Sequence, residues 1–176
     1  EMKYTVYWRM LMYKFEDDSL MLHTDLYQIN MLQTYWQNGM DQRKAVFESY
    51  FRSIPFENGF AIFAGLERIL NYINNLKVTQ SDLDYLRSLE TYPEEFLTYL
   101  ENMEFNLTIR SMREGELCFA DEPLIQVEGP LGQCQLVETA ILNMLNYQTL
   151  IATKAARLKS VVDEDDSLAE FGSRRA

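Results

Sequence analysis

One long helical pattern near the end of the chain constrains the fold more than any other feature. It begins at Gly129-Pro130 and repeats apolar residues at helical spacing as far as Leu158. Further apolar side chains fall on its neighbouring faces, and a helix that is apolar nearly all round is normally buried. Residues 146–149 mark a place where it could bend or break. We therefore expect a long buried helix over residues 130–160.

Shorter patterns precede and follow this helix. Residues 22–36 repeat apolar side chains at helical spacing, Asp25 and Gln28 fit a capping box at their start, and Asn38-Gly39 ends the pattern. Helical patterns also cover 66–76, 83–89 (capped by Ser81 and Asp84) and the segment after Pro93, and strand-like patterns cover 46–51, 106–112, 117–119, 124–128 and 168–172. The residues alone thus predict a soluble α/β or α+β domain.

Composition excludes several classes of function. The 176 residues carry 16 Lys and Arg against 27 Asp and Glu, a formal net charge of −11. Such acidity argues against a nucleic-acid partner, which needs clustered cations, and against docking on an anionic membrane. No run of 18 apolar residues occurs, so we expect no membrane span. A hydrophobic content of 47% allows one domain with a substantial core, but the length does not allow a large two-domain enzyme.

Cysteine and histidine are scarce. Cys118 and Cys134 are not spaced as a metal knuckle or a redox pair and are too few for a disulfide scaffold, so we expect a reducing, cytoplasmic location. His23 is the only histidine, which excludes a His-ligated metal cluster and a Ser-His-Asp or Cys-His site built within this chain. We expect no metal site among these residues.

Candidate site residues are few when taken without family knowledge. Arg174 and Arg175 follow the strand expected at 168–172, where an anion could bind beyond the strand end. A frayed basic terminus explains the same pair, and composition alone favours that explanation. Tyr27, on a helix, is typical of a core or interface anchor.

Six local strings, in order over residues 22–176, carry a family resemblance. They are LHTDLYQINM at 22–31, FRSIPF at 51–56, FAIFAGL at 60–66, EPLIQVEGP at 122–130, ETAILN at 138–143 continued by LIATKAAR at 150–157, and EFGSRRA at 170–176. Together they resemble the nicotinate phosphoribosyltransferases. Residues 1–15 lie outside the resemblance, and we interpret them as a leader or a cloning-derived segment.

The resemblance implies an activity and an architecture. The family makes nicotinate mononucleotide from nicotinate and phosphoribosyl pyrophosphate in the salvage route to NAD, and uses ATP with Mg²⁺ through a phosphorylated histidine. Its members are homodimers with shared active sites. Their fold is an α+β N-terminal domain on an irregular, TIM-like α/β barrel of the type II phosphoribosyltransferase kind. We therefore expect residues 16–160 to form the N-terminal domain and 161–176 to begin the barrel, cut short.

Five residues match substrate-binding positions of the family. Tyr27 matches a tyrosine that stacks on the pyridine ring from the partner subunit, and Phe171 would stack on the other face. Arg174 matches an arginine at the pyridine and phosphate site, and Arg175 is a weaker candidate for the same anion. Asp25 would orient the helix of Tyr27 or contact the ligand. Helix capping explains Asp25 equally well, and core packing explains Phe171.

The sequence departs from the family where the barrel should follow. No catalytic residue is identifiable, because the phosphorylated histidine is expected beyond Ala176 and His23 is not its counterpart. We expect the 176 residues alone to be inactive and the helix over 136–158 to expose apolar faces. One alternative is a non-catalytic remnant or interaction module. Another is the nicotinamide-using sister family, which residues 26–28 and 170–175 resemble less closely.

Overall fold

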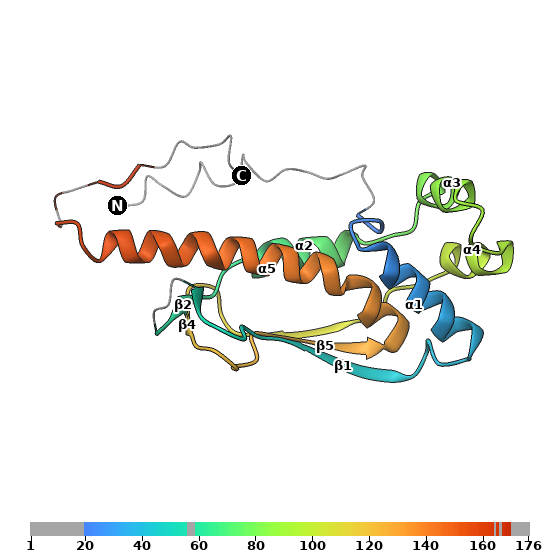
Figure 1. The fold of residues 1–176 in the computed structure, drawn as a ribbon, viewed down its shortest axis with the longest axis horizontal. Coiled ribbons are helices and arrows are strands. Elements are labelled where there is room, and N and C mark those ends of the chain that lie inside the picture. The colour runs from blue at the N-terminus through green and yellow to red at the C-terminus, as the bar shows by residue number, and fades with distance from the viewer. Residues whose placement is uncertain (1–19, 56–58, 164, 166, 170–176) are drawn as a thin grey trace. The chain divides into compact units, whose positions relative to one another are not determined.

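The computed structural model describes residues 20–55, 59–163, 165 and 167–169. Helices and strands both occur, which confirms the mixed fold class (Figure 1). The chain divides into two compact units. Of the described residues, we call those within 23–74 and 105–169 the sheet unit, and those within 20–22 and 75–104 the helical unit.

The core of the sheet unit is a three-stranded antiparallel sheet. Its order is β1-β5-β3, and the strands are β1 (Lys44–Ser49), β5 (Ile125–Pro130) and β3 (Thr108–Ser111). Val127 is buried and pairs in register with Phe47 on one side and Ile109 on the other, which gives the sheet an apolar inner face. Two further strands, β2 (Ala61–Ile62) and β4 (Leu117–Cys118), form a separate antiparallel pair.

Helix α5 (Leu131–Lys159) packs against strands β1 and β5 of the sheet, and α1 (Leu26–Gln37) packs against α5 (Figure 1). The 29 residues of α5 run unbroken, so the break considered at 146–149 does not occur. Residues 132–137 are all buried, whereas Leu142, Ile151 and Leu158 are exposed. The expected exposure of apolar side chains within 136–158 is therefore present.

Polar side chains of α5 explain why it continues through the expected break. The Thr149 hydroxyl accepts from the backbone N–H of Ala64 and donates to its carbonyl, both at 3.1 Å. One turn later, Thr153 accepts from the N–H of Ile62 at 2.9 Å. Because both hydroxyls satisfy the backbone beside β2, these residues tie α5 to its neighbour instead of ending it.

Helix α2 (Leu66–Asn75) starts at a glycine that its surroundings require. Gly65 has φ +116°, a conformation that L side chains rarely adopt, and an added Cβ would lie 3.1 Å from the Met144 carbonyl oxygen. The Glu114 carboxylate accepts from the N–H groups of Gly65 at 2.7 Å and Leu66 at 2.9 Å. The side chain thereby caps the positive end of the helix.

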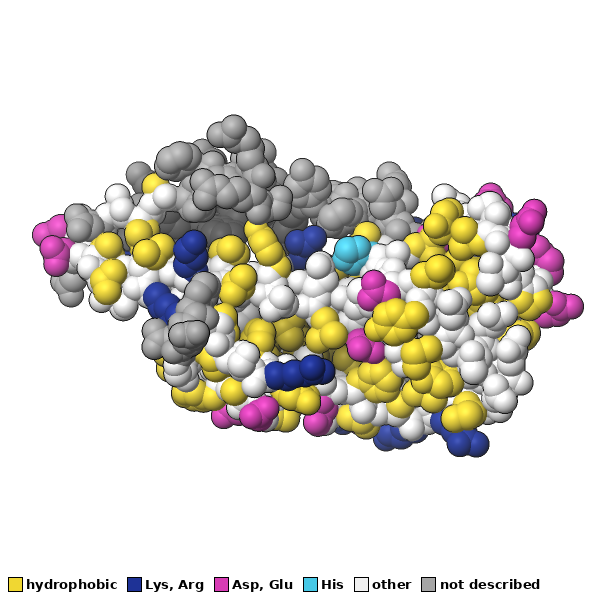
Figure 2. Space-filling view, viewed as in Figure 1, with side chains coloured by type: hydrophobic (Ala, Val, Ile, Leu, Met, Phe, Trp, Pro, Cys, Tyr) yellow, Lys and Arg dark blue, Asp and Glu magenta, His cyan; other side chains and the backbone are white. Residues whose placement is uncertain are grey.

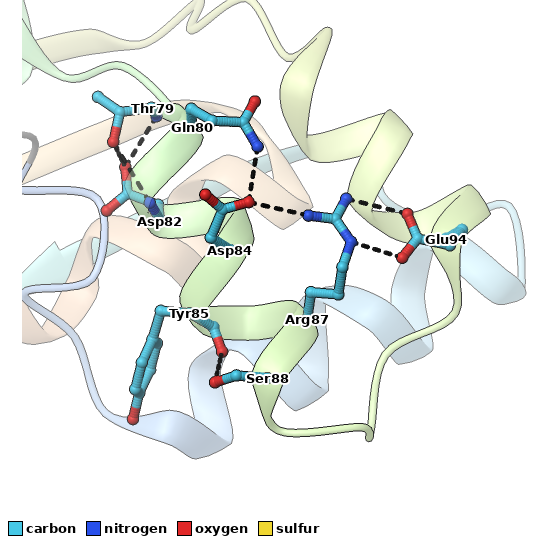
Figure 3. Close-up of polar contacts among 8 residues, drawn as sticks. All are labelled: Thr79, Gln80, Asp82, Asp84, Tyr85, Arg87, Ser88 and Glu94. Carbon is cyan, nitrogen blue, oxygen red and sulfur yellow. Dashed lines mark hydrogen bonds and ion pairs between the residues drawn. The ribbon is translucent and has the colours of Figure 1, made fainter.

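The helical unit contains α3 (Gln80–Ser88) and α4 (Glu94–Glu101), which meet through polar contacts (Figure 3). The capping box of α3 is Thr79 with Asp82, not Ser81 with Asp84 as expected. Asp82 accepts from the Thr79 N–H at 2.8 Å and its hydroxyl at 2.6 Å, while Asp84 accepts from the side chains of Gln80 and Arg87 instead. The helix consequently begins two residues before the expected cap would allow.

Three further sequence predictions concern membrane spans, the cysteines and the strand at 168–172. Among the helices of the described ranges, none has the length and hydropathy that a bilayer span requires. Cys118 and Cys134 are both free and buried. Of the strand expected at 168–172, Leu168 and Ala169 are described and are not in a strand, and residues 170–172 lie outside the described residues.

Candidate functional site

A cavity of about 430 Å³ opens in the sheet unit between the start of α1 and the middle of α5. Figure 2 shows hydrophobic side chains around a hollow on this face. Its lining combines aromatic, aliphatic, amide and acidic groups: Asp25, Tyr27, Tyr50, Phe51, Leu124, Glu138, Thr139, Leu142, Asn143, Leu145 and Asn146. A volume of this size accommodates a small heteroaromatic molecule.

Two of the sequence-predicted residues, Asp25 and Tyr27, lie together at this cavity. Tyr27 occupies the first turn of α1 with 51% of its surface exposed. Asp25 is the N-cap residue, but its side chain makes no capping hydrogen bond, so the capping box with Gln28 is wrong. Its carboxylate instead accepts from the Thr139 hydroxyl on α5 at 3.0 Å. A helix-to-helix contact has replaced the local one.

Gln28 turns inward and is fully buried. Its amide nitrogen lies 2.9 Å from the Tyr27 hydroxyl, 3.3 Å from the Glu138 carboxylate and 3.4 Å from the Thr139 hydroxyl. Its carbonyl oxygen accepts from the Gln135 amide, which also donates to Glu138 at 3.0 Å. We call these five side chains, which link the two helices, the α1–α5 polar seam.

The charge around the cavity is negative. Asp25 and Glu138 both line it, and none of its lining side chains within the described part of the chain is Lys or Arg. Partial desolvation, followed by the charges of Glu138 and Asp25, raises the pKa of Tyr27 above its ordinary value, although the Gln28 hydrogen bond opposes this shift. The phenol therefore remains protonated and neutral at physiological pH, and an anionic ligand would need a cation from elsewhere.

Three predicted residues, Phe171, Arg174 and Arg175, lie outside the described residues. His23, considered and dismissed from the sequence, is exposed. Within the described ranges, no group of three or more His, Cys, Asp or Glu side chains could hold a metal ion. The described wall thus offers an aromatic face and polar acceptors, but no cation for phosphate.

Sequence reasoning missed the α5 side of this site. Glu138 and Thr139 belong to one of the six resemblance strings, yet no role could be assigned to them from the string alone. Phe51 belongs to another string and lines the same cavity. The sequence signal that could have pointed to Glu138, Thr139 and Phe51 is that each lies in one of the resemblance strings. Gln135, which lies outside every string, gave no such signal.

The matching family model and the curated relatives described next name one family. Residues 22–146 match the model of the nicotinate phosphoribosyltransferase (NAPRTase) N-terminal domain. The nicotinate phosphoribosyltransferase of Bacillus subtilis is 57% identical over 167 residues, which are 95% of this chain and 34% of that protein. The one from Caenorhabditis elegans is 45% identical over 164 residues, 90% of this chain and 29% of that protein.

A solved structure gives the same picture. The crystal structure of human nicotinic acid phosphoribosyltransferase superposes with a TM-score of 0.78 at 37% identity. The match covers 87% of this chain and 31% of the human chain. The chain therefore spans about a third of the length of the curated relatives that it matches.

Proposed function

This chain belongs to the nicotinate phosphoribosyltransferase family, and on that premise we propose that the complete protein makes nicotinate mononucleotide from nicotinate and phosphoribosyl pyrophosphate. The reaction would be coupled to ATP hydrolysis and would serve the salvage synthesis of NAD. The observation that carries the proposal for these residues is the exposed ring of Tyr27 beside a cavity of suitable size. Neutral aromatic faces stack well on a flat pyridine ring.

Tyr27 supplies one face of the ring site in this proposal. Phe171 would cover the opposite face, and Arg174, assisted by Arg175, would pair with the carboxylate. An arginine fork is needed because Asp25 and Glu138 give the described wall a negative charge that disfavours an anion. Catalysis then consists of holding the pyridine nitrogen in line with the anomeric carbon.

The phosphate-bearing groups do not fit the described residues. The phosphates of ATP and phosphoribosyl pyrophosphate need cationic side chains, and the cavity lining offers carboxylates instead. Mg²⁺ needs a cluster of oxygen ligands, and within the described ranges no group of three or more His, Cys, Asp or Glu side chains could hold a metal ion. We assign their binding to residues outside these ranges.

A cytoplasmic homodimer with shared sites completes the proposal. The two buried, free cysteines suit a reducing compartment. In such a dimer Tyr27 would reach the ring bound by the partner subunit, so a site would combine Tyr27 of one protomer with Arg174 of the other. A two-fold arrangement makes both sites equivalent.

The direct test supplies the complete gene product with phosphoribosyl pyrophosphate, ATP and either nicotinate or nicotinamide, and quantifies both mononucleotides by chromatography. We expect product from nicotinate, and a lower kcat/KM for the amide. Preference for nicotinamide would indicate the sister activity, and no product from either would indicate a non-catalytic module.

Substituting Tyr27→Ala should lower kcat/KM for nicotinate about tenfold, the size of one aromatic stacking contact. The matched control is Tyr85→Ala, which removes a comparably exposed helical tyrosine from the helical unit.

Co-expressing Y27A with R174A tests shared sites. Half of the dimers would be heterodimers with one intact site of two, so activity should return to roughly a quarter of the wild-type value. Activity no higher than the average of the two variants alone would place both residues in one protomer's site.

A further inference from the structure

We propose that Glu138 and Gln28 are positioning residues that fix the Tyr27 hydroxyl as an outward hydrogen-bond donor, so that the ligand group beside it must be an acceptor. The inference rests on the proposed function, because it takes Tyr27 as the residue that meets the pyridine substrate. It goes further by identifying how the hydrogen bonds of the ring site are oriented and which residues orient them.

Glu138 determines the orientation of both buried amides. A carboxylate only accepts hydrogen bonds, and the Glu138 oxygen is approached by Gln28 at 3.3 Å and by Gln135 at 3.0 Å. Both side chains must therefore present their nitrogen to Glu138. Flipping either amide would place a carbonyl oxygen against the carboxylate, a costly contact for groups with exposed fractions of only 0% and 5%.

This orientation continues from Gln28 to Tyr27. With its nitrogen turned to Glu138, Gln28 uses its carbonyl oxygen to accept from Gln135 and donates from the same nitrogen to the Tyr27 oxygen at 2.9 Å. The Tyr27 hydroxyl is consequently an acceptor inside the seam. Its own hydrogen lies near the ring plane and turns away from Gln28, toward the open side of the residue.

A free phenolic hydrogen selects for an acceptor on the ligand. Both oxygens of a pyridine carboxylate can accept once the carboxylate turns out of the pyridine plane toward the stacked tyrosine, whereas an amide presents an acceptor in only one of its two orientations. The donor would also offset part of the repulsion between an anionic substrate and the two acidic side chains of the cavity, Asp25 and Glu138. Phosphate oxygens of the second substrate share this acceptor chemistry, so the kinetics of each substrate must be followed separately.

A double-mutant cycle on the complete gene product tests the relay. E138Q keeps the shape of the side chain but lets either amide flip, and Y27F removes the hydroxyl while keeping the ring. We expect E138Q to raise KM for nicotinate about tenfold, with kcat and the KM for phosphoribosyl pyrophosphate nearly unchanged, and to have no effect in the Y27F background. E95Q, which makes the same change at an exposed glutamate of α4, is the control.

Equal effects of E138Q in both backgrounds would overturn the proposal, since Glu138 would then support the fold without acting through Tyr27. A change in the KM for phosphoribosyl pyrophosphate alone would assign the acceptor to phosphate and overturn the carboxylate assignment. A wild-type protein without activity would refute the proposed function, whereas equal effects of E138Q in an active protein with and without the Tyr27 hydroxyl would refute the relay alone.

Discussion

Polar side chains join two helices both in the helical unit and in the α1–α5 polar seam, but the two sets of contacts differ in sequence separation and in burial. In the helical unit, Arg87 reaches Glu94 only seven residues away, and the two side chains are 45% and 64% exposed. In the seam, Gln28 meets Gln135 across 107 residues, and both are buried. The first pair can exchange its partner for water, whereas the second cannot.

This difference determines how much each contact can contribute. Exposed ion pairs add little stability because water and salt compete for both charges. A buried amide that loses its partner keeps the full cost of desolvation, so removing one member of the seam should propagate to the others. We therefore expect substitutions of similar size to have very different effects in the two regions.

The largest effect is expected for Gln28→Leu. The substitution removes the buried acceptor of one Gln135 N–H and a donor to the Glu138 carboxylate, and should lower the local unfolding free energy of α1 by about 3 kcal/mol. Hydrogen–deuterium exchange of the α1 amides measures that free energy in the complete protein.

Gln37→Leu is the matched control for this change. Gln37 is the last residue of the same helix and is exposed, so its exchange should stay within a few tenths of a kcal/mol of the wild type. Equal protection in both variants would mean that the seam contributes no more than a surface contact, and the comparison of the two regions would fail.

A smaller effect, about 2 kcal/mol, is expected for Thr149→Val. The two side chains have nearly the same volume, but valine leaves the N–H and carbonyl of Ala64 without the hydroxyl that now bonds both. Exchange of the Ala64 amide should accelerate. Thr98→Val, at an exposed position of α4, should leave protection there unchanged. Unchanged Ala64 exchange would show that water replaces the hydroxyl and that burial matters less at this contact.

The same distinction between local and long-range contacts explains how far the sequence could predict the structure. The long helix was expected at 130–160 and occupies 131–159, and the strand expected at 124–128 occupies 125–130, because periodicity and Gly-Pro punctuation are local properties. The cap of α3 was misplaced by two residues because Thr79 and Ser81 both precede an aspartate by three, and only the packed structure gives Asp82 both Thr79 donors.

The candidate site was predicted in part. Asp25 and Tyr27 lie at the cavity, but the role of Gln28 was wrong, since the capping pattern is local and the partners that turned its side chain inward are more than 100 residues away. No period or motif reports such a pairing. Buried polar contacts of this kind are the part of a site that sequence reasoning is least able to supply.

The smallest effect is expected for Arg87→Met, and its pH dependence completes the comparison. The Arg87 hydrogen bond, followed by its charge, holds the pKa of Glu94 below its ordinary value. A carboxyl with a depressed pKa stabilises the folded state above its unfolded pKa and loses that contribution as the pH falls through the folded pKa. R87M should therefore unfold at slightly lower urea than the wild type at pH 7, and at the same urea once the pH has fallen below the folded pKa of Glu94, where that carboxyl is protonated in both. Pulsed hydrogen exchange of residues 80–101 in a urea series measures the two midpoints, and raising the salt concentration at pH 7 should also bring them together. A difference that persists at low pH would instead come from packing of the arginine stem along α3, and the exposed pair would then resemble the seam more than its charges suggest.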